Sequence, residues 1–373
     1  MAMRVVCRED SAPAFWDEML YSAGLEAGLC QSEYWAVVIG KIERAKPIFL
    51  KVVDGDTEEP VVSLMVFHKT AWDKIRQRKL SGINEMIRGR VNGWLEWFDG
   101  PVFYSKNKEE VLEGLDKLLL WLHSYAGEKK INKIISRGLA NTSIWINDPD
   151  VEKVFQRHGY ASDRWATYLL RLDQDEQKLW DCVDHSVRKN VNKSQRSISS
   201  VRKAVSLEDL RVFYEVYVSI QSGGGRSAGP FLNWQIQWEE DKKKRYKYYI
   251  AQSAEGEALG VLGMYMFNGV ATEIASGLTK RAFELKIPAQ DMLHWEMLLD
   301  AKRSGCVVLN LAGVNPSPDD QKEIGIRRFK EKWGGSYVEF NRPRFDSNPL
   351  KCVENVLALA YKKIRLVQGV NVW

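Results

Sequence analysis

The order of helical and extended segments in the second half of the 373-residue chain constrains its fold most strongly. A strand-like segment and two helical segments come first, and three consecutive strand-like segments follow them. A further helix begins at Pro288, which suits the first helical position, and a last strand follows that helix. The strands are 167–173, 245–254, 258–269, 271–279 and 307–313, and the helices are 175–194, 207–220 and 288–305. This order predicts an α+β unit with a mainly antiparallel sheet.

The first half of the chain shows a weaker copy of the same order. Its segments are a helix at 10–23, a hairpin of strands 47–54 and 60–69, a helix at 108–129 and a strand at 133–138. At about 100 to 200 residues per domain, the chain length also predicts roughly two domains. The sequence therefore predicts two tandem modules, residues 1–165 and 166–344, each with helices flanking a mixed, mainly antiparallel sheet.

Composition narrows the class of protein. Hydrophobic residues make up 45% and charged residues 28%, which excludes a disordered or fibrous chain, and a net charge of +5 is too small for a nucleic-acid coat. The five cysteines form no CxxC pair, so we expect reduced thiols and no metal site.

The longest uncharged apolar run, 258–267, is about half of a membrane span. We expect a cytoplasmic protein with at most a peripheral contact with the inner face of the membrane.

Residues 311–340, LAGVNPSPDDQKEIGIRRFKEKWGGSYVEF, resemble a signature of the FemABX family. In that signature a strand ending in Ala-Gly or a Gly pair leads to a phrase of the form GxxxFKxxFGG. Segments 29–38, 155–180 and 186–198 resemble other family segments in the expected order. The element order of the second half is also that of the GNAT acyltransferase fold. The resemblance implies two tandem GNAT-like domains, the first completed by a C-terminal segment, 345–373.

The resemblance also implies a reaction class. FemABX enzymes move an amino acid from aminoacyl-tRNA to an amine of a peptidoglycan precursor, and related proteins transfer acyl groups in surface-glycan synthesis. We therefore expect an acyltransferase or aminoacyltransferase without a tightly bound cofactor. Its donor would be aminoacyl-tRNA or acyl-CoA, and its acceptor an amine, such as a phosphate-containing envelope precursor; DNA is not an expected partner. Two alternatives are an acyl-CoA-dependent N-acyltransferase acting on an amino sugar or small amine, and a non-catalytic module that binds tRNA or glycan.

Lys330 is the first candidate for catalysis. Acyl transfer needs positive charge or hydrogen-bond donors where the tetrahedral oxyanion develops. Lys330 belongs to the matched Phe-Lys pair, and the resemblance implies that it lies near the donor and stabilises this charge, with Phe329 orienting it. Gly313, Gly334 and Gly335 are expected to shape the site, the last two by permitting a turn. The alternative for Lys330 is the solvated face of a basic helix.

A basic segment is the second candidate. Residues 185–203 contain six basic residues and no acidic one. Helical spacing places Lys189, Lys193 and Arg196 on one face, which together with Arg188 is expected to bind the phosphates of tRNA, CoA or a nucleotide-linked precursor. The arginines are the stronger candidates, because guanidinium binds phosphate in a bidentate manner. A solvated amphipathic helix is the alternative.

The loop 281–290 bears on the donor. In CoA-dependent GNAT enzymes this position has a glycine-rich loop whose NH groups bind pyrophosphate at a helix N-terminus. Here those glycines are absent, and Pro288 has no NH to donate. The standard CoA site is therefore not expected in the second module. Arg281, at the start of this loop, is a further phosphate-binding candidate.

Three tryptophans of the first module are candidates for lining a substrate cleft: Trp35, Trp94 and Trp97. Trp94 and Trp97 lie in a glycine-bounded segment, and their rings could stack on a base or a sugar. Peptidoglycan enzymes of the family can have a lysine soon after the tryptophan that aligns with Trp35, whereas here the nearest one is Lys41. This difference weakens the assignment of a muramyl-peptide acceptor.

Overall fold

The computed structural model describes residues 3–70, 93–138, 142–145, 147–198, 200–223 and 227–347. The first module begins with a strand and two helices, continues with a hairpin, and ends with a long helix, a strand and a short helix. Its elements are β1 (Arg4–Glu9), α1 (Trp16–Ser22), α2 (Glu33–Glu43), β2 (Lys46–Val53), β3 (Pro60–Lys69), β4 (Trp94–Trp97), β5 (Val102–Phe103), α5 (Lys108–Glu128), β6 (Lys133–Ser136) and α6 (Pro149–Arg157), with short 3₁₀ helices at Gly24–Glu26 and Leu29–Gln31.

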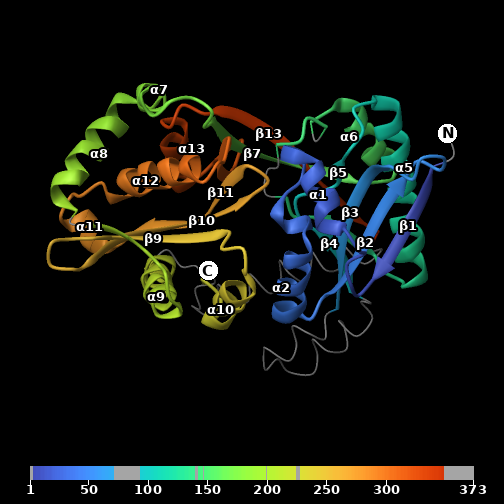
Figure 1. Ribbon diagram of the computed structural model, residues 1–373, viewed down its shortest axis with the longest axis horizontal. Coiled ribbons are helices and arrows are strands. Elements are labelled where there is room, and N and C mark those ends of the chain that lie inside the picture. Colours follow the sequence, from blue (N-terminus) through green and yellow to red (C-terminus); the bar gives the residue numbers. More distant parts are fainter. Residues whose placement is uncertain are drawn as a thin grey trace, which may run out of the picture.

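The second module contains the meander that the sequence predicts. Its elements are β7 (Ala161–Arg171), α7 (Glu176–Cys182), α8 (His185–Ser197), β8 (Ser200–Lys203), α9 (Leu207–Gly223), α10 (Phe231–Glu240), β9 (Tyr246–Gln252), β10 (Ala258–Phe267), β11 (Val270–Leu278), α11 (Lys280–Glu284), α12 (Ala289–Arg303), β12 (Val308–Val314), α13 (Gln321–Glu331) and β13 (Ser336–Asp346). Helices α8 and α12 cover one face of the strands, and α9 and α10 cover the other (Figure 1).

The described strands of both modules form one continuous sheet. Their spatial order is β1-β2-β3-β4-β6-β13-β7-β12-β11-β10-β9-β8, and β5 pairs with β3. Most neighbours are antiparallel, but β4 runs parallel to β6, and β11 runs parallel to β12. The two parallel pairs occupy equivalent places in the two modules, which are therefore copies of one α+β arrangement, as the sequence predicts.

Alternating side chains of β2 show how this sheet is buried on both faces. Ile48, Leu50 and Val52 join the apolar cluster under α5, whereas Phe49 points to the opposite face and packs with α1 and α2. Successive residues of a strand point to opposite faces, so a strand buried on both sides must be apolar throughout. This explains the continuous hydrophobic run that predicts β2.

The last described strand joins the two modules. Residues Ser336–Arg344 of β13 pair with β7, and Arg344–Asp346 also pair with β6 of the first module. Residues 345–346 of the C-terminal segment thus pair with a strand of the first module. The remainder of that segment, 348–373, lies outside the described residues, as do residues 71–92.

The prediction of a single helix at 175–194 is wrong. Val183 has extended backbone angles and ends α7, and the Asp184 carboxylate accepts a hydrogen bond of 2.7 Å from the NH of Ser186 to start α8. An aspartate in this N-cap position satisfies an NH group that lacks a helical partner. The chain therefore turns between two helices, and α8 is free to pack against α12.

Among the described helices, none is both long and apolar enough to cross a bilayer.

Candidate active site

The parallel strands β11 and β12 separate partway along their length. Their ladder consists of three pairs and ends at Thr272–Asn310, although β11 continues to Leu278 and β12 to Val314. The register of β10 against β11 shifts beside Glu273, and the register of β12 against β7 shifts just after Asn310. Bulges of this kind are common beside active sites because they re-aim side chains. The place beyond Thr272 and Asn310, where the two strands no longer pair, is here called the strand gap.

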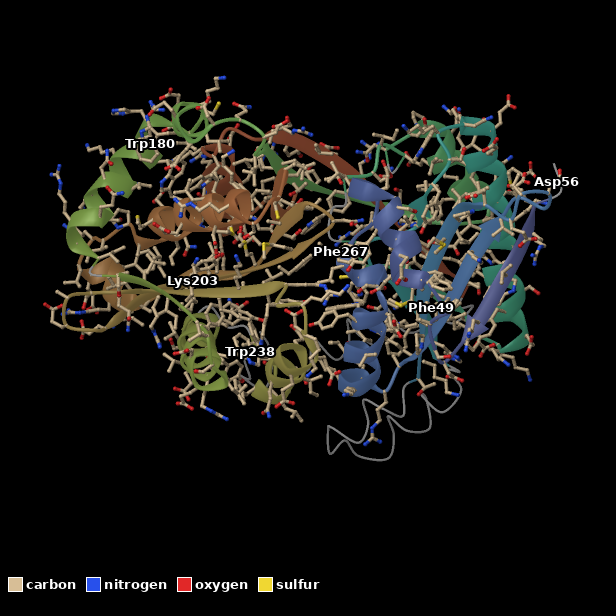
Figure 2. All side chains as sticks on the ribbon, in the orientation of Figure 1. Phe49, Asp56, Trp180, Lys203, Trp238 and Phe267 are labelled. Carbon is tan, nitrogen blue, oxygen red and sulfur yellow. The ribbon has the colours of Figure 1, made fainter. Side chains whose placement is uncertain are left out.

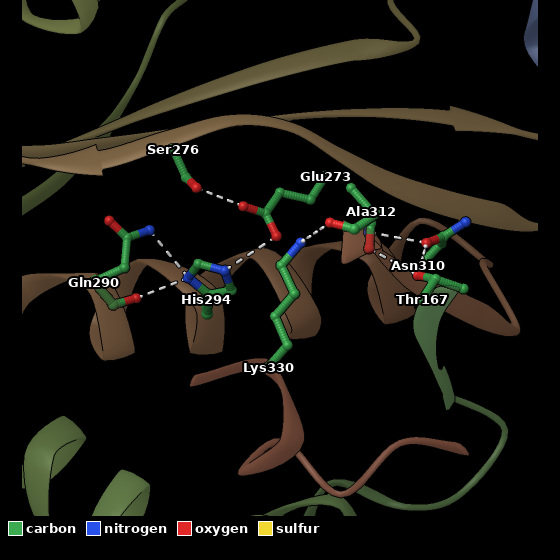
Figure 3. A network of polar contacts seen from close by, with 9 residues as sticks. Thr167, Glu273, Ser276, Gln290, His294, Asn310, Ala312 and Lys330 are labelled. Carbon is green, nitrogen blue, oxygen red and sulfur yellow. Dashed lines mark hydrogen bonds and ion pairs between the residues drawn. The ribbon is translucent and has the colours of Figure 1, made fainter. Parts of the chain in front are cut away.

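Three ionisable side chains from three elements meet at the strand gap (Figure 3). Glu273 comes from β11, His294 from α12 and Lys330 from α13, and each is at most 7% exposed. His294 Nε2 lies 3.3 Å from Glu273 Oε2, and Lys330 Nζ donates a 3.4 Å hydrogen bond to the carbonyl of Gly313. Buried ionisable groups of this kind are candidates for a functional site.

The surroundings favour the charged form of Glu273. Burial alone would raise the pKa of this carboxyl, but His294, Lys330 and the hydroxyl of Ser276 together lower it to about 2. Ser276 Oγ donates to Glu273 Oε1 over 2.5 Å. For Lys330 the balance is different: burial lowers the pKa of the amine, and the charge of Glu273 opposes that shift. The protonation of Lys330 therefore depends on Glu273.

A second polar network fixes the β12 side of the gap. Ala312 has a positive φ of 59°, and Asn310 Oδ1 accepts hydrogen bonds from the NH of Ala312 at 2.9 Å and from Thr167 Oγ1 at 2.7 Å. These bonds hold the bulge that aims the Gly313 carbonyl at Lys330. The site thus has a backbone acceptor held in place by side chains of two strands.

Aromatic rings hold α13 against α12. The Phe329 ring lies edge-on to His294 at 4.9 Å, and Trp333 stacks on the same imidazole at 5.4 Å. Trp333 is almost completely buried. Phe329 and Trp333 therefore pack α13 against His294 of α12.

The three glycines of the matched signature lie where a side chain does not fit. A Cβ on Gly313 would lie 2.0 Å from Trp165 Nε1, and one on Gly335 would lie 2.6 Å from a methyl group of Leu170. Gly334 has a φ of +75°, and its Cβ would lie 2.4 Å from the carbonyl oxygen of Cys182. Gly334 and Gly335 make the turn from α13 into β13.

The basic candidates of α8 divide into two groups. Arg188 donates to the carbonyls of Trp180, Asp181 and Val183 at 3.2, 3.0 and 2.7 Å, so its guanidinium caps the end of α7. Lys193 Nζ donates to the carbonyl of Lys286 at 2.7 Å.

Lys189 and Arg196 are exposed on the same helix. Arg281 is also exposed and pairs with Glu257 at 2.9 Å and with Glu284 at 3.7 Å.

Helix α8 lies across the start of α12. Asn190 donates to the Asp291 carboxylate at 3.2 Å, and Ser194 donates to the carbonyl of Pro288 at 3.0 Å. The NH groups of Ala289 and Asp291 already donate to backbone carbonyls. This helix start thus presents a buried carboxylate, and burial raises the pKa of Asp291.

The structure does not bring the three tryptophans to the strand gap. Trp97 is fully buried in the core of the first module and donates to the carbonyl of Gly100 at 3.0 Å. Trp94 donates to Glu96 at 2.6 Å, and Trp35 lies edge-on to Phe98 at 6.0 Å.

Sequence reasoning missed Glu273 and His294. Glu273 is the one acidic residue of the strand-like segment 271–279, and an isolated charge in an apolar strand is a signal that could have revealed it. His294 has no comparable signal, because a single histidine in a helix is common.

Comparisons with known proteins place this site within a matched segment. Residues 232–361, which include Glu273, His294 and Lys330, match the FemAB family. A crystal structure of FemX is similar over 93% of this chain and 99% of its own, with a TM-score of 0.70 and 12% identity. No curated protein matches the sequence significantly.

Two further solved structures share the fold. L-PGS from Bacillus licheniformis is 13% identical, with a TM-score of 0.52, and the match covers 94% of this chain and 96% of that one. A tandem GNAT protein from the clavulanic acid biosynthesis pathway is 12% identical, also with a TM-score of 0.52, over 93% and 99% of the two chains. These similarities confirm the two tandem GNAT-like modules.

Proposed function

We propose that this chain, part of which matches the FemAB family, is a transferase that moves an aminoacyl group from aminoacyl-tRNA to an amine of a cell-envelope precursor. The observation that carries the proposal is the buried Lys330, aimed into the strand gap from the segment that matches the family. A lysine on a solvated helix face, the alternative from the sequence, would be exposed, whereas this side chain is enclosed by three elements.

In the proposed reaction, the acceptor amine attacks the ester carbonyl carbon of the aminoacyl-tRNA. A C–N bond forms and the carbonyl oxygen becomes an oxyanion. The ester C–O bond then breaks, and the tRNA hydroxyl leaves with the proton that the amine gives up. The Lys330 ammonium, held by the Gly313 carbonyl, stabilises the oxyanion. A preorganised donor in such a position typically contributes about 10²- to 10³-fold to the rate.

The start of α12 supports tRNA rather than acyl-CoA as the donor. A pyrophosphate at a helix N-terminus needs free NH groups and no competing negative charge. Here Pro288 has no NH, neighbouring NH groups already have backbone partners, and the carboxylate of Asp291 is buried under α8. The same residues would have to rearrange before a CoA could bind in the usual way.

We assign the tRNA backbone to the exposed part of α8. Lys189 and Arg196 can turn toward a phosphate without breaking a contact between helices, whereas Arg188 and Lys193 hold neighbouring carbonyls. Arg281 is a further candidate once its surface ion pair with Glu257 opens. Because charged tRNA is a cytoplasmic substrate, we place the protein in the cytoplasm with at most peripheral membrane contact.

The first test compares Lys330→Ala with Lys322→Ala, which changes an exposed lysine on the same helix. Transfer from radiolabelled aminoacyl-tRNA to a panel of envelope-precursor amines is followed at saturating acceptor. Lys330→Ala should lower kcat about 10²- to 10³-fold, and Lys322→Ala should leave it unchanged.

Two outcomes would contradict the proposal. If acetyl-CoA binds at micromolar concentration and supports transfer while charged tRNA does not, the chain is an acyl-CoA-dependent enzyme. If the wild-type protein binds tRNA or glycan but transfers nothing from either donor, it is a non-catalytic binding module. Circular dichroism of both variants controls for loss of fold.

A further inference from the structure

The carboxylate of Glu273 has no assigned role in the proposed reaction, although it lies beside Lys330 at the strand gap. It is 6% exposed and comes from the bulged position of β11. A buried charge without a partner is strongly destabilising, so a carboxylate kept at this depth needs compensating contacts. The side chains that contact Glu273 therefore indicate its role.

A role as general base does not fit these partners. Ser276 donates to one carboxylate oxygen at 2.5 Å, and the imidazole of His294 lies 3.3 Å from the other. Each oxygen of the carboxylate thus has a partner inside the protein. The same contacts stabilise the ionised form, which makes the carboxylate a weak base.

We infer that Glu273, held by Ser276 and His294, is the counter-charge that keeps the Lys330 side chain a cation at the strand gap. This inference rests on the proposed function of Lys330 and makes Glu273 a positioning residue. Lys330 has an uncharged backbone carbonyl as its hydrogen-bond partner, and such a partner alone does not offset the burial of an ammonium group. A cationic lysine stabilises an oxyanion more strongly than a neutral amine, because its hydrogen bond is charge-assisted.

Among the residues that the structure describes, few charged groups face this pair. On α12, His294 contacts Glu273 directly, and Asp291 interacts electrostatically with the same histidine. The residues of β12 and β7 that line this side, Asn310 and Thr167, are uncharged. Glu273 is therefore the negative charge that acts on Lys330.

The test is the pH dependence of transfer in Glu273→Gln, which preserves shape and removes the charge. Removing an opposite charge beside a lysine lowers its pKa by roughly 1 to 3 units. The fall of kcat on the alkaline side should move to lower pH by that amount, while KM for the acceptor changes little. Asp300→Asn is the matched control, because this carboxylate on α12 is also buried and pairs with Lys203 and Lys247. It should leave the pH profile in place.

A double variant separates charge from structure. Arginine stays protonated without a counter-charge, so Glu273→Gln should cost much less in a Lys330→Arg background than in the wild type when both are compared at pH 8.5. An equal cost in the two backgrounds would mean that Glu273 supports the fold alone, and the inference would be wrong.

A measurement without substrate keeps the inference distinct from the proposed function. NMR of protein labelled at lysine side chains, with the Lys330 signal assigned by Lys330→Arg, follows the titration of this one amine. A lower titration midpoint in Glu273→Gln supports the inference even if no acceptor is ever found for the enzyme. An unchanged midpoint overturns it even if transfer is observed.

Discussion

Gly334 shows how a single residue shapes the site. Its φ of +75° lies in the left-handed region, and an added Cβ would meet the carbonyl oxygen of Cys182 at 2.4 Å. A backbone atom cannot give way as the end of a flexible side chain can. The turn that returns the chain from α13 to β13, and so the position of Lys330, therefore depends on a residue without a side chain.

Gly334→Ala should lower the free energy of unfolding by at least about 2 kcal/mol, because left-handed backbone is costly for alanine and the Cys182 carbonyl must move. Urea denaturation measures the change. Gly127→Ala is the matched control: Gly127 lies in α5 with no atom near its added Cβ, so alanine should stabilise the protein by about 0.5–1 kcal/mol. Equal effects at the two positions would contradict this account.

The residues of the site differ in how far the sequence predicts them. Lys330 follows from a local motif, and the structure shows it to be buried. Glu273 lies 57 residues before Lys330 in the sequence. The two side chains meet only because β11 and α13 flank the same gap. No local pattern encodes that meeting, since it depends on the sheet order.

At the scale of elements, Arg188 joins two helices that the sequence predicts as one. Its guanidinium donates to three carbonyls at the end of α7, groups that have no partner within their own helix. The side chain of Arg188, from the following helix, stabilises the bend at Val183. The helical spacing of apolar residues continues across this bend. This is why periodicity alone misses the break.

Arg188→Ala should lower the free energy of unfolding by about 1–3 kcal/mol, because charged donors to these carbonyls are lost. Arg196→Ala, at an exposed position of the same helix, should change stability by less than about 0.5 kcal/mol.

The affinity for tRNA should respond in the opposite way. Arg196→Ala should weaken binding and reduce the slope of log affinity against log salt by roughly 0.7–0.9.

Thermal denaturation and filter binding at several salt concentrations give both quantities. If Arg188→Ala lowers the salt slope without lowering stability, Arg188 contacts phosphate and does not cap α7.

Elements with a strong local signal were predicted well. The meander of β9, β10 and β11 follows from apolar runs separated by short turns, and α5 follows from its apolar spacing. The sequence did not predict β1, β8 or α10, nor the extent of β7. β1 and β8 form the edges of the sheet, α10 covers one face, and β7 lies at the centre between β13 and β12.

At the scale of the molecule, the two modules share a core as well as a sheet. Phe49 of the first module and Phe267 of the second belong to one buried cluster, and both are labelled in Figure 2. Asn268 Nδ2 donates to the carbonyls of Leu20 and Gly24 at 2.9 and 2.7 Å. We propose that the module boundary near residue 165, within β7, is a boundary of topology and not of stability.

This arrangement predicts one cooperative unfolding transition. A module that lost its partner would expose the shared cluster and the edges of β7 and β13, so it should not persist alone. Tryptophan fluorescence and hydrogen exchange of β2 and β10 should give the same midpoint in urea. Asn268→Gly removes its two hydrogen bonds to Leu20 and Gly24 but permits the φ of 49°, and it should lower that common midpoint for both probes. Lys130→Gly, at a positive φ of 55° away from the junction, should not lower it. Two separate midpoints, or a shift confined to one module, would show that the modules fold independently despite the continuous sheet.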